Sequence, residues 1–203
     1  MTADSGAIID ISELTGEYQT IGNVAPKGIA GSGLLRLVHH FVKKGIILPL
    51  GQISPEAPKK RLSLWKGAPA IHLYQSENKT ILLTQNDIRE FQLAKGAIRA
   101  ALDVLSKEAR LEIPEKIFIS GAFCKALRPQ VLLEIGLLPP MDSKKIIVIG
   151  NRSLTGANLA FFDSQKQNID TICSKIIYHE LTNRPDFQEI FALAMKLASD
   201  EML

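Results

Sequence analysis

Three short apolar runs, each followed by a turn and then by a helical pattern, constrain the fold of this chain more than any other feature. The runs are Ile117–Ser120, Lys145–Ile149 and Lys175–His179, and the first two end at Gly121 and Gly150. Near-continuous apolar strands that alternate with helices are typical of a parallel or mixed sheet covered on both faces. The sequence therefore predicts an α/β fold.

Helical periodicity predicts the elements between and before these strands. Apolar residues from Leu34 to Val42 recur at helical spacing, with Ser32 as the expected cap and Gly45 as the stop. Thr84, with Asp87 three residues later, resembles a capping box, and the apolar stripe that follows extends to about residue 109. Further helices are expected at about 129–136, 154–162 and from Pro185 to about 199.

The N-terminal part of the chain predicts shorter elements. Residues 7–11 and 20–21 are expected to form strands without an obvious partner, and residues 49–70 an irregular loop. Residues 70–74 and 80–83 flank a polar turn and are expected to pair as a hairpin. We expect two subdomains: residues 1–80 with the glycine loop, first helix and hairpin, and residues 81–203 with the long helix and the α/β units.

Bulk properties exclude several classes of protein. The 203 residues carry a net charge of only +3, with Lys and Arg scattered, so a nucleic-acid partner is not expected. There is no secretion signal and no apolar run near the roughly 20 residues of a membrane span. Cys124 and Cys173 are too few for an iron–sulfur cluster and are expected to be buried in a reducing compartment. A soluble, cytoplasmic protein is therefore expected.

Catalytic and metal-binding motifs are missing from the sequence. The four histidines, His39, His40, His72 and His179, do not pair with a cysteine or carboxylate at a metal-ligand spacing. No G-x-S-x-G elbow occurs, and no residue is a convincing general base. The sequence thus predicts no catalytic residue and no metal site.

A glycine-rich run precedes the first long helix and offers one candidate binding site. Backbone N–H groups around Gly28, Gly31, Ser32 and Gly33 would lie at a helix start, where a phosphate is favoured. The spacing matches neither a Walker motif nor a dinucleotide fingerprint. A tight turn that allows close helix packing explains the same residues, and both interpretations stay open.

The glycines that end two neighbouring strands form a second candidate site. Gly121 and Ala122 follow the first strand of the C-terminal sheet, and Gly150 and Asn151 follow the next. Open α/β sheets bind ligands just beyond the carboxyl ends of their strands, and small residues allow the backbone to approach a ligand. The alternative is that the glycines only release each strand into its helix.

One face of the long helix carries polar and cationic side chains. Gln92, Lys95 and Arg99 share this face, which adjoins the apolar stripe. Such a face can stack against a purine or hold a phosphate. It can equally be a solvated rim, with Lys95 paired to Glu90 or Asp103.

Several strings of this sequence resemble the C-terminal ATPase-like domain of the reductive activators of corrinoid proteins. They occur in the family's order through nearly the whole chain: Pro26–Leu34, Thr84–Ala100, Ile119–Phe123, Ile135–Pro139, Gly150–Ala157 and Pro185–Gln188, after Met1-x-Ala3-x-x-Gly6-Ala-Ile8. The resemblance implies half of a ribonuclease-H-like, actin-like ATPase fold, within the actin, sugar-kinase and heat-shock ATPase superfamily.

The resemblance also implies a function and a site. Members of the family are implied to use ATP, with Mg, to drive electron transfer from an iron–sulfur domain onto the cobalt of a corrinoid held by a methyltransferase partner. The strand and turn at Ile119–Phe123 are implied to contact the adenosine, and the helix with Lys95 and Arg99 to lie against the adenine. Nucleotide-binding residues are therefore expected at the following positions: Gln92, Lys95, Arg99, Gly121, Ala122, Phe123, Gly150 and Asn151.

This sequence departs from the family pattern at the turn and upstream of it. Gly121-Ala122-Phe123-Cys124 stands where the family has Gly-Gly-Phe-Gly, and Arg152-Ser153 replace small residues. No Asp-x-Gly-Thr phosphate loop occurs, so nothing would orient magnesium or hold the β- and γ-phosphates.

These departures predict a chain that binds nucleotide weakly and hydrolyses none by itself, with no iron–sulfur cluster. The strands near 117–120 and 146–149 would expose an apolar face, so a homo-oligomer or a complementing chain is expected. The partner would be a corrinoid protein or its methyltransferase. The alternatives are a non-catalytic docking or dimerisation module and, third, a stand-alone kinase-like enzyme.

Overall fold

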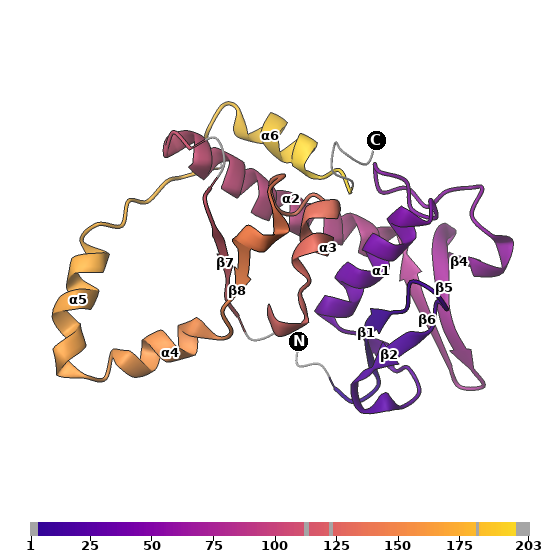
Figure 1. Cartoon of the computed structure of the whole chain (residues 1–203). Coiled ribbons are helices and arrows are strands. Elements are labelled where there is room, and N and C mark those ends of the chain that lie inside the picture. Colours follow the sequence, from indigo (N-terminus) through magenta and orange to yellow (C-terminus); the bar gives the residue numbers. More distant parts are fainter. Residues whose placement is uncertain (1–3, 112–113, 122–123, 182, 198–203) are drawn as a thin grey trace.

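The computed structural model describes residues 4–111, 114–121, 124–181 and 183–197 and has the expected α/β architecture (Figure 1). Its helices are α1 (Gly31–Lys43), α2 (Gln85–Glu108), α3 (Pro129–Glu134), α4 (Arg152–Leu159), α5 (Asp163–Cys173) and α6 (Phe187–Ala194). Its strands are β1 (Ala7–Ile11), β2 (Tyr18–Thr20), β3 (Gly28–Ile29), β4 (Leu62–Trp65), β5 (Ala68–Ser76), β6 (Lys79–Thr84), β7 (Ile117–Ile119) and β8 (Ile146–Val148). Short 3₁₀ turns lie at Ile21–Asn23, Lys59–Arg61, Cys124–Ala126 and Ser143–Lys145.

The strands of the N-terminal part pair with one another. β1 lies in the middle of a mixed sheet, antiparallel to β2 and parallel to β3. α1 packs on β1 through Gly33, where an added Cβ would lie 1.9 Å from the carbonyl oxygen of Ile8. Only glycine allows this contact, so the close-packing interpretation holds for Gly33.

The two ends of α1 match the sequence prediction unequally. The helix begins at Gly31 with Ala30 as its N-cap, so Ser32 lies inside the first turn and the predicted cap was wrong. Ser32 is buried where the helix meets the sheet. Gly45, with φ +68°, follows the helix in a left-handed conformation that favours glycine, which confirms the predicted stop.

The predicted hairpin is present, but it belongs to a larger sheet. β5 and β6 pair antiparallel around the turn, and β4 adds a third strand at Leu62–Trp65, inside the region expected to be an irregular loop. α2 then begins with the predicted capping box. The Thr84 backbone N–H donates to Asp87 Oδ2 at 2.8 Å, and the Asp87 N–H donates to Thr84 Oγ1 at 3.1 Å.

β7 and β8 form a separate two-stranded parallel sheet, with Ile117 opposite Ile146. The third predicted strand, Lys175–His179, is wrong: this segment is irregular, and Ile177 is 77% exposed. An apolar run forms a strand only where another strand is free to pair with it, and no strand of the described residues pairs with this segment. The sheet also exposes an apolar side chain, because Phe118 is 59% exposed.

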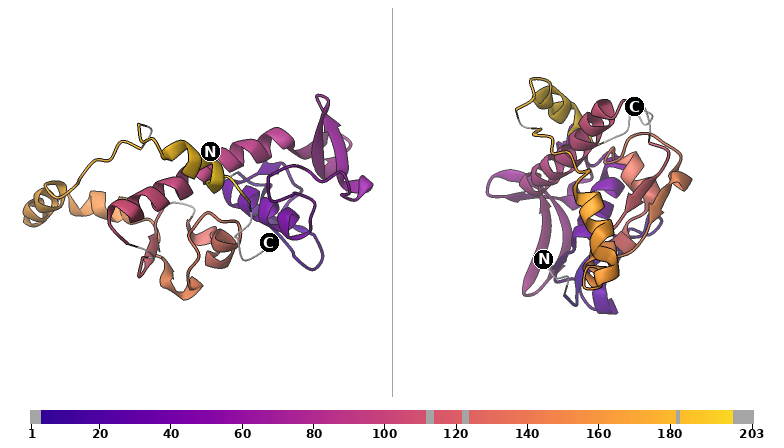
Figure 2. Two further views of the ribbon diagram at one scale, coloured as in Figure 1. Left: turned by 90° about the horizontal axis from the view of Figure 1, so that it is seen from above. Right: turned by 90° about the vertical axis from the view of Figure 1, so that its left-hand side faces the viewer.

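α4 and α5 extend away from the rest of the molecule as an arm, as Figures 1 and 2 show. The sequence predicted a helix at 154–162, close to α4, but it did not predict α5. The chain returns from the arm to α6, which packs along α2. The last predicted helix starts close to α6, but α6 ends at Ala194, so the predicted end near residue 199 was too late. Residues 195–197 are not helical, and residues 198–199 lie outside the described residues.

Two apolar clusters hold the body together. The larger lies between α1, the first two sheets and α2 and includes Phe41 and Ile71. The smaller surrounds α3 and includes Leu132 and Ile146. Cys124 is buried as expected, whereas Cys173, on the arm, is exposed and was wrongly predicted to be buried. The division at residue 80 stays a prediction.

No helix within the described ranges is both long and apolar enough to cross a membrane.

Candidate functional site

The structure brings the two glycine turns of the C-terminal sheet together. The backbone N–H of Gly121 donates a hydrogen bond of 3.2 Å to the carbonyl oxygen of Gly150. Both residues have positive φ, +145° and +73°, which side chains with a Cβ rarely adopt. A Cβ at either position would meet nothing within 4 Å, so the space beside both turns is open. A ligand can therefore approach this backbone closely.

Asn151, which was also predicted to bind nucleotide at these turns, is the N-cap of α4 and thus the first residue of the arm. Its Oδ1 accepts a hydrogen bond of 3.3 Å from the Leu154 N–H and caps α4. This bond satisfies one of the free N–H groups at the helix start. Ala122 and Phe123, also predicted to bind nucleotide, lie outside the described residues.

The predicted face of α2 turns toward α6 rather than toward solvent. Gln92 Nε2 donates to the carbonyl oxygens of Leu50 and Met195, both at 3.1 Å. Lys95, only 3% exposed, donates to the carbonyl oxygens of Ala194, at 2.7 Å, and of Lys196. These carbonyls lie at the C-terminal end of α6, where the helix dipole favours a cation.

The ammonium group of Lys95 lies in an unfavourable electrostatic position. Burial is the main cause and the positive charge of Arg99 adds to it, so the pKa of Lys95 is lowered to about 8 despite the nearby carboxylate of Asp103. Among the described residues, no carboxylate lies within ion-pair distance of Lys95. The α6 carbonyls accept hydrogen bonds from this buried ammonium group and partly offset its lost hydration.

Asp103, one of the two carboxylates considered as a partner of Lys95, pairs with Arg99 instead. Arg99 Nε donates to both oxygens of Asp103, at 2.8 and 2.9 Å, one helical turn away. Its Nη1 donates to the carbonyl oxygen of Leu138 at 3.1 Å, which ties α2 to the segment after α3.

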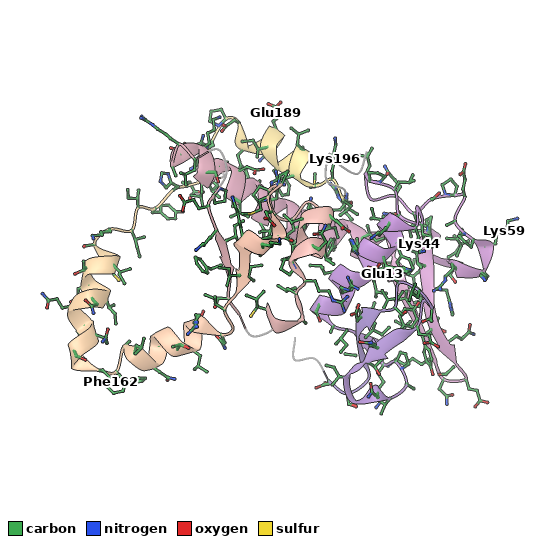
Figure 3. All side chains as sticks on the ribbon, in the orientation of Figure 1. Glu13, Lys44, Lys59, Phe162, Glu189 and Lys196 are labelled. Atoms are coloured by element: carbon green, nitrogen blue, oxygen red, sulfur yellow. The ribbon has the colours of Figure 1, made fainter. Side chains whose placement is uncertain are left out.

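A cavity of about 380 Å³ lies beside these side chains, between α2 and α6. Lys95, Arg99 and Lys196 supply positive charge, Asp103 supplies negative charge, and the other walls are apolar. Figure 3 labels Lys196 at the end of α6. Its volume is at the lower end of the range of small-molecule pockets. Neither glycine of the turn pair lines it, so the predicted nucleotide-binding residues form two groups and not one site.

The predicted phosphate loop, Gly28–Gly33, lies apart from both the glycine turns and the α2–α6 cavity and forms a third candidate site. Gly28 and Gly31 have open space where a Cβ would lie, and they border a cavity of about 410 Å³ that Lys27 and Lys79 also line. Two lysines near a helix start favour an anion. The packing of Gly33 against Ile8 explains that glycine without a ligand. Phosphate binding at Gly28, Gly31 and Ser32 stays a prediction.

The described residues contain no group of three or more His, Cys, Asp or Glu side chains that could hold a metal ion.

Sequence reasoning missed two polar pairings that link distant elements. His39 Nε2 lies 2.6 Å from Glu134 Oε2 although 95 residues separate them, and Asp10 bridges Arg36, at 2.6 Å, and Arg128, at 2.5 Å. Both pairings join the β1–α1 unit to α3. Metal-ligand spacing gives no signal for such contacts, because they depend on the fold.

Comparisons with known proteins agree with the resemblance seen in the sequence. The model of the family described as the C-terminal domain of RACo, the ASKHA domain, matches residues 1–203. The corrinoid activation enzyme RamQ of Eubacterium limosum is 28% identical over 219 residues, which cover 100% of this chain and 37% of that protein.

Among solved structures, the reductive activator for corrinoid, iron–sulfur protein has a TM-score of 0.87 at 32% identity, over 100% of this chain and 34% of that one. This chain thus spans little more than a third of the length of these relatives. Because the family model covers every residue, the chain belongs to the family of the C-terminal ASKHA domain of RACo.

Proposed function

We propose that this chain is the C-terminal, nucleotide-facing part of an ATP-dependent reductive activator of corrinoid proteins. The names of both relatives, which are activators of corrinoid proteins, support this assignment. The single observation that carries the nucleotide site is the pairing of the Gly121 and Gly150 turns at the carboxyl ends of two parallel strands. Its setting is a cytoplasmic methyltransferase system, with a corrinoid protein or its methyltransferase as the partner.

In this proposal the chain's own backbone binds the adenosine side of the nucleotide. No side chain lies in front of the backbone at these turns, which suits close approach of a planar base and its ribose. Gln92, Lys95 and Arg99 hold α6 and the segment after α3 in place on the same subdomain.

Phosphoryl transfer requires groups that this chain does not supply. No Asp-x-Gly-Thr loop occurs in its 203 residues, and positioning and charge stabilisation account for nearly all of the catalysis of this reaction. We therefore expect adenosine, ADP and ATP to bind with similar affinity. A much tighter binding of ATP would instead favour a phosphate contact at Gly28–Gly31.

Isothermal titration with adenosine, ADP and ATP, with and without magnesium, tests the proposal. The expected result is a dissociation constant in the micromolar range that Gly121→Ala weakens, because alanine is strained at φ +145°. Gly156→Ala is the matched control, since Gly156 lies in α4 with open space and ordinary helical φ. The proposal is contradicted if the wild type binds none of the three ligands.

A docking or dimerisation module is the second candidate, and the arm favours it. Large apolar side chains of the arm and of the segment after it are exposed, among them the following residues: Leu154, Phe161, Phe162, Ile172, Ile176, Ile177 and Tyr178. Figure 3 labels Phe162 at the corner between α4 and α5. Apolar surface of this extent typically marks a protein–protein interface. A second copy or a complementing chain would cover it, with or without nucleotide binding.

A further inference from the structure

The hydroxyl group of Ser120 connects the two glycine turns. Ser120 follows the last residue of β7, and its Oγ donates a hydrogen bond of 3.0 Å to the carbonyl oxygen of Gly150. The same Oγ accepts a hydrogen bond of 3.0 Å from the N–H of Arg152, the first residue of α4. One side chain thereby joins the end of β7, the turn after β8 and the start of the arm.

The two hydrogen bonds of Ser120 matter because few other hydrogen bonds hold the Gly121 and Gly150 turns together. The ladder between β7 and β8 pairs only three residues from each strand, and a sheet of two short strands is marginally stable by itself. Beyond the ladder, the Ile149 N–H donates to Ile119, and the N–H groups of Gly121 and Arg152 both donate to the Gly150 carbonyl. Both hydrogen bonds of Ser120 add to this small set, and Ser120 itself is exposed to solvent.

We infer that Ser120 is a positioning residue for nucleotide binding, an inference that rests on the proposed function. Its hydroxyl fixes the spacing of the Gly121 and Gly150 turns and directs the start of α4, so that the open backbone surface is formed before the ligand arrives. Ser120 acts through the turns and not by contact with the nucleotide. Alanine at this position removes both hydrogen bonds, whereas threonine keeps the hydroxyl and places its methyl group toward solvent.

Titration of nucleotide into Ser120→Ala and Ser120→Thr tests this role, with Ser76→Ala, at the exposed end of β5, as control. A side-chain hydrogen bond contributes about 0.5–1.5 kcal/mol, so Ser120→Ala is expected to weaken ADP binding about two- to tenfold. Ser120→Thr and Ser76→Ala should bind as the wild type does. Hydrogen exchange provides a second readout, and the amide of Gly121 should exchange faster in Ser120→Ala alone. The Arg152 amide keeps its hydrogen bond of 3.1 Å to the Gly150 carbonyl in this variant and is not used as the readout.

The outcomes separate this inference from the proposed function. Wild-type binding with unchanged affinity in Ser120→Ala overturns the positioning role and leaves the function intact. Equal losses in Ser120→Ala and Ser120→Thr also overturn it, because the hydroxyl is then not what matters. No nucleotide binding by the wild type overturns the function, and the role of Ser120 with it.

Discussion

The ammonium group of Lys95, in the middle of α2, donates a hydrogen bond of 2.7 Å to the backbone carbonyl oxygen of Ala194 at the end of α6. Nearby, the N–H of Leu197 donates to the carbonyl oxygen of Pro49 at 2.8 Å, and Gln92 also holds Met195. The C-terminal end of α6 is thus bound to two parts of the body by polar contacts.

Replacing Lys95 with methionine should therefore loosen α6. The variant keeps the length of the side chain but removes its hydrogen bonds to the α6 carbonyls, at an expected cost of about 1–3 kcal/mol. Lys107→Met is the matched control, because Lys107 lies on the same helix, is 66% exposed and pairs with Asp186 before α6. Urea unfolding measures both. A Lys95→Met variant as stable as Lys107→Met contradicts the structural role of Lys95.

The contact between Gly33 and β1 predicts a difference between two neighbouring glycines. Gly33→Ala would place a Cβ 1.9 Å from the Ile8 carbonyl oxygen, so α1 must shift away from the sheet. Overpacking of this kind costs typically about 1–3 kcal/mol or more. Gly31→Ala meets nothing within 4 Å and should leave the melting temperature nearly unchanged. Thermal unfolding of both variants checks the prediction, and equal melting temperatures would contradict it.

Glu134 links the stability of the chain to acidic pH. Burial raises the pKa of Glu134, but hydrogen bonds from Gln130 and His39 and the charges of His39 and Lys43 outweigh burial and lower the pKa overall. A carboxyl whose pKa is lower in the folded than in the unfolded chain stabilises the fold above its unfolded pKa, near 4.3, and this contribution disappears as the pH falls through the folded value.

Glu134→Gln should therefore be less stable than the wild type at pH 7, and the difference should shrink between about pH 5 and pH 3. Unfolding midpoints across this range measure the effect. Glu77→Gln, in the exposed turn of the β5–β6 hairpin, serves as the control and should follow the wild type throughout. A constant difference between wild type and Glu134→Gln over this pH range would sink the prediction.

The arm predicts an effect on association without an effect on folding. Phe161 and Phe162 are 86% and 60% exposed, so Phe161→Ser with Phe162→Ser should leave the melting temperature unchanged. If the arm forms an interface, the double variant should dissociate at concentrations where the wild type is associated. Light scattering after size exclusion measures the mass of both. A wild type that stays monomeric at high concentration rules out self-association through the arm.

Local signals in the sequence predicted the elements that depend on neighbouring residues. The Thr84–Asp87 capping box fixes the start of α2 within one turn, and Gly121 and Gly150 mark the ends of β7 and β8. The family resemblance added the fold, because its strings occur in the right order along the chain. These features need no knowledge of distant contacts.

Features that depend on distant contacts could not be predicted in this way. Ile176 and Ile177 have strong β propensity, yet in the part of the chain that the structure describes no strand pairs with them. The prediction that Cys173 is buried failed because the arm has little around it. The pairing of His39 with Glu134 and the hydrogen bonds of Lys95 to the carbonyls at the end of α6 both appear only once α3 and α6 are placed.

The central claim is that this chain binds the purine side of ATP without the loops that cleave it. The most direct measurement is phosphate release from ATP by the purified chain, made at nucleotide concentrations where titration shows the site to be filled. The account predicts a filled site and no release above the uncatalysed rate. Steady phosphate release by the chain alone, abolished in Gly121→Ala, would contradict it.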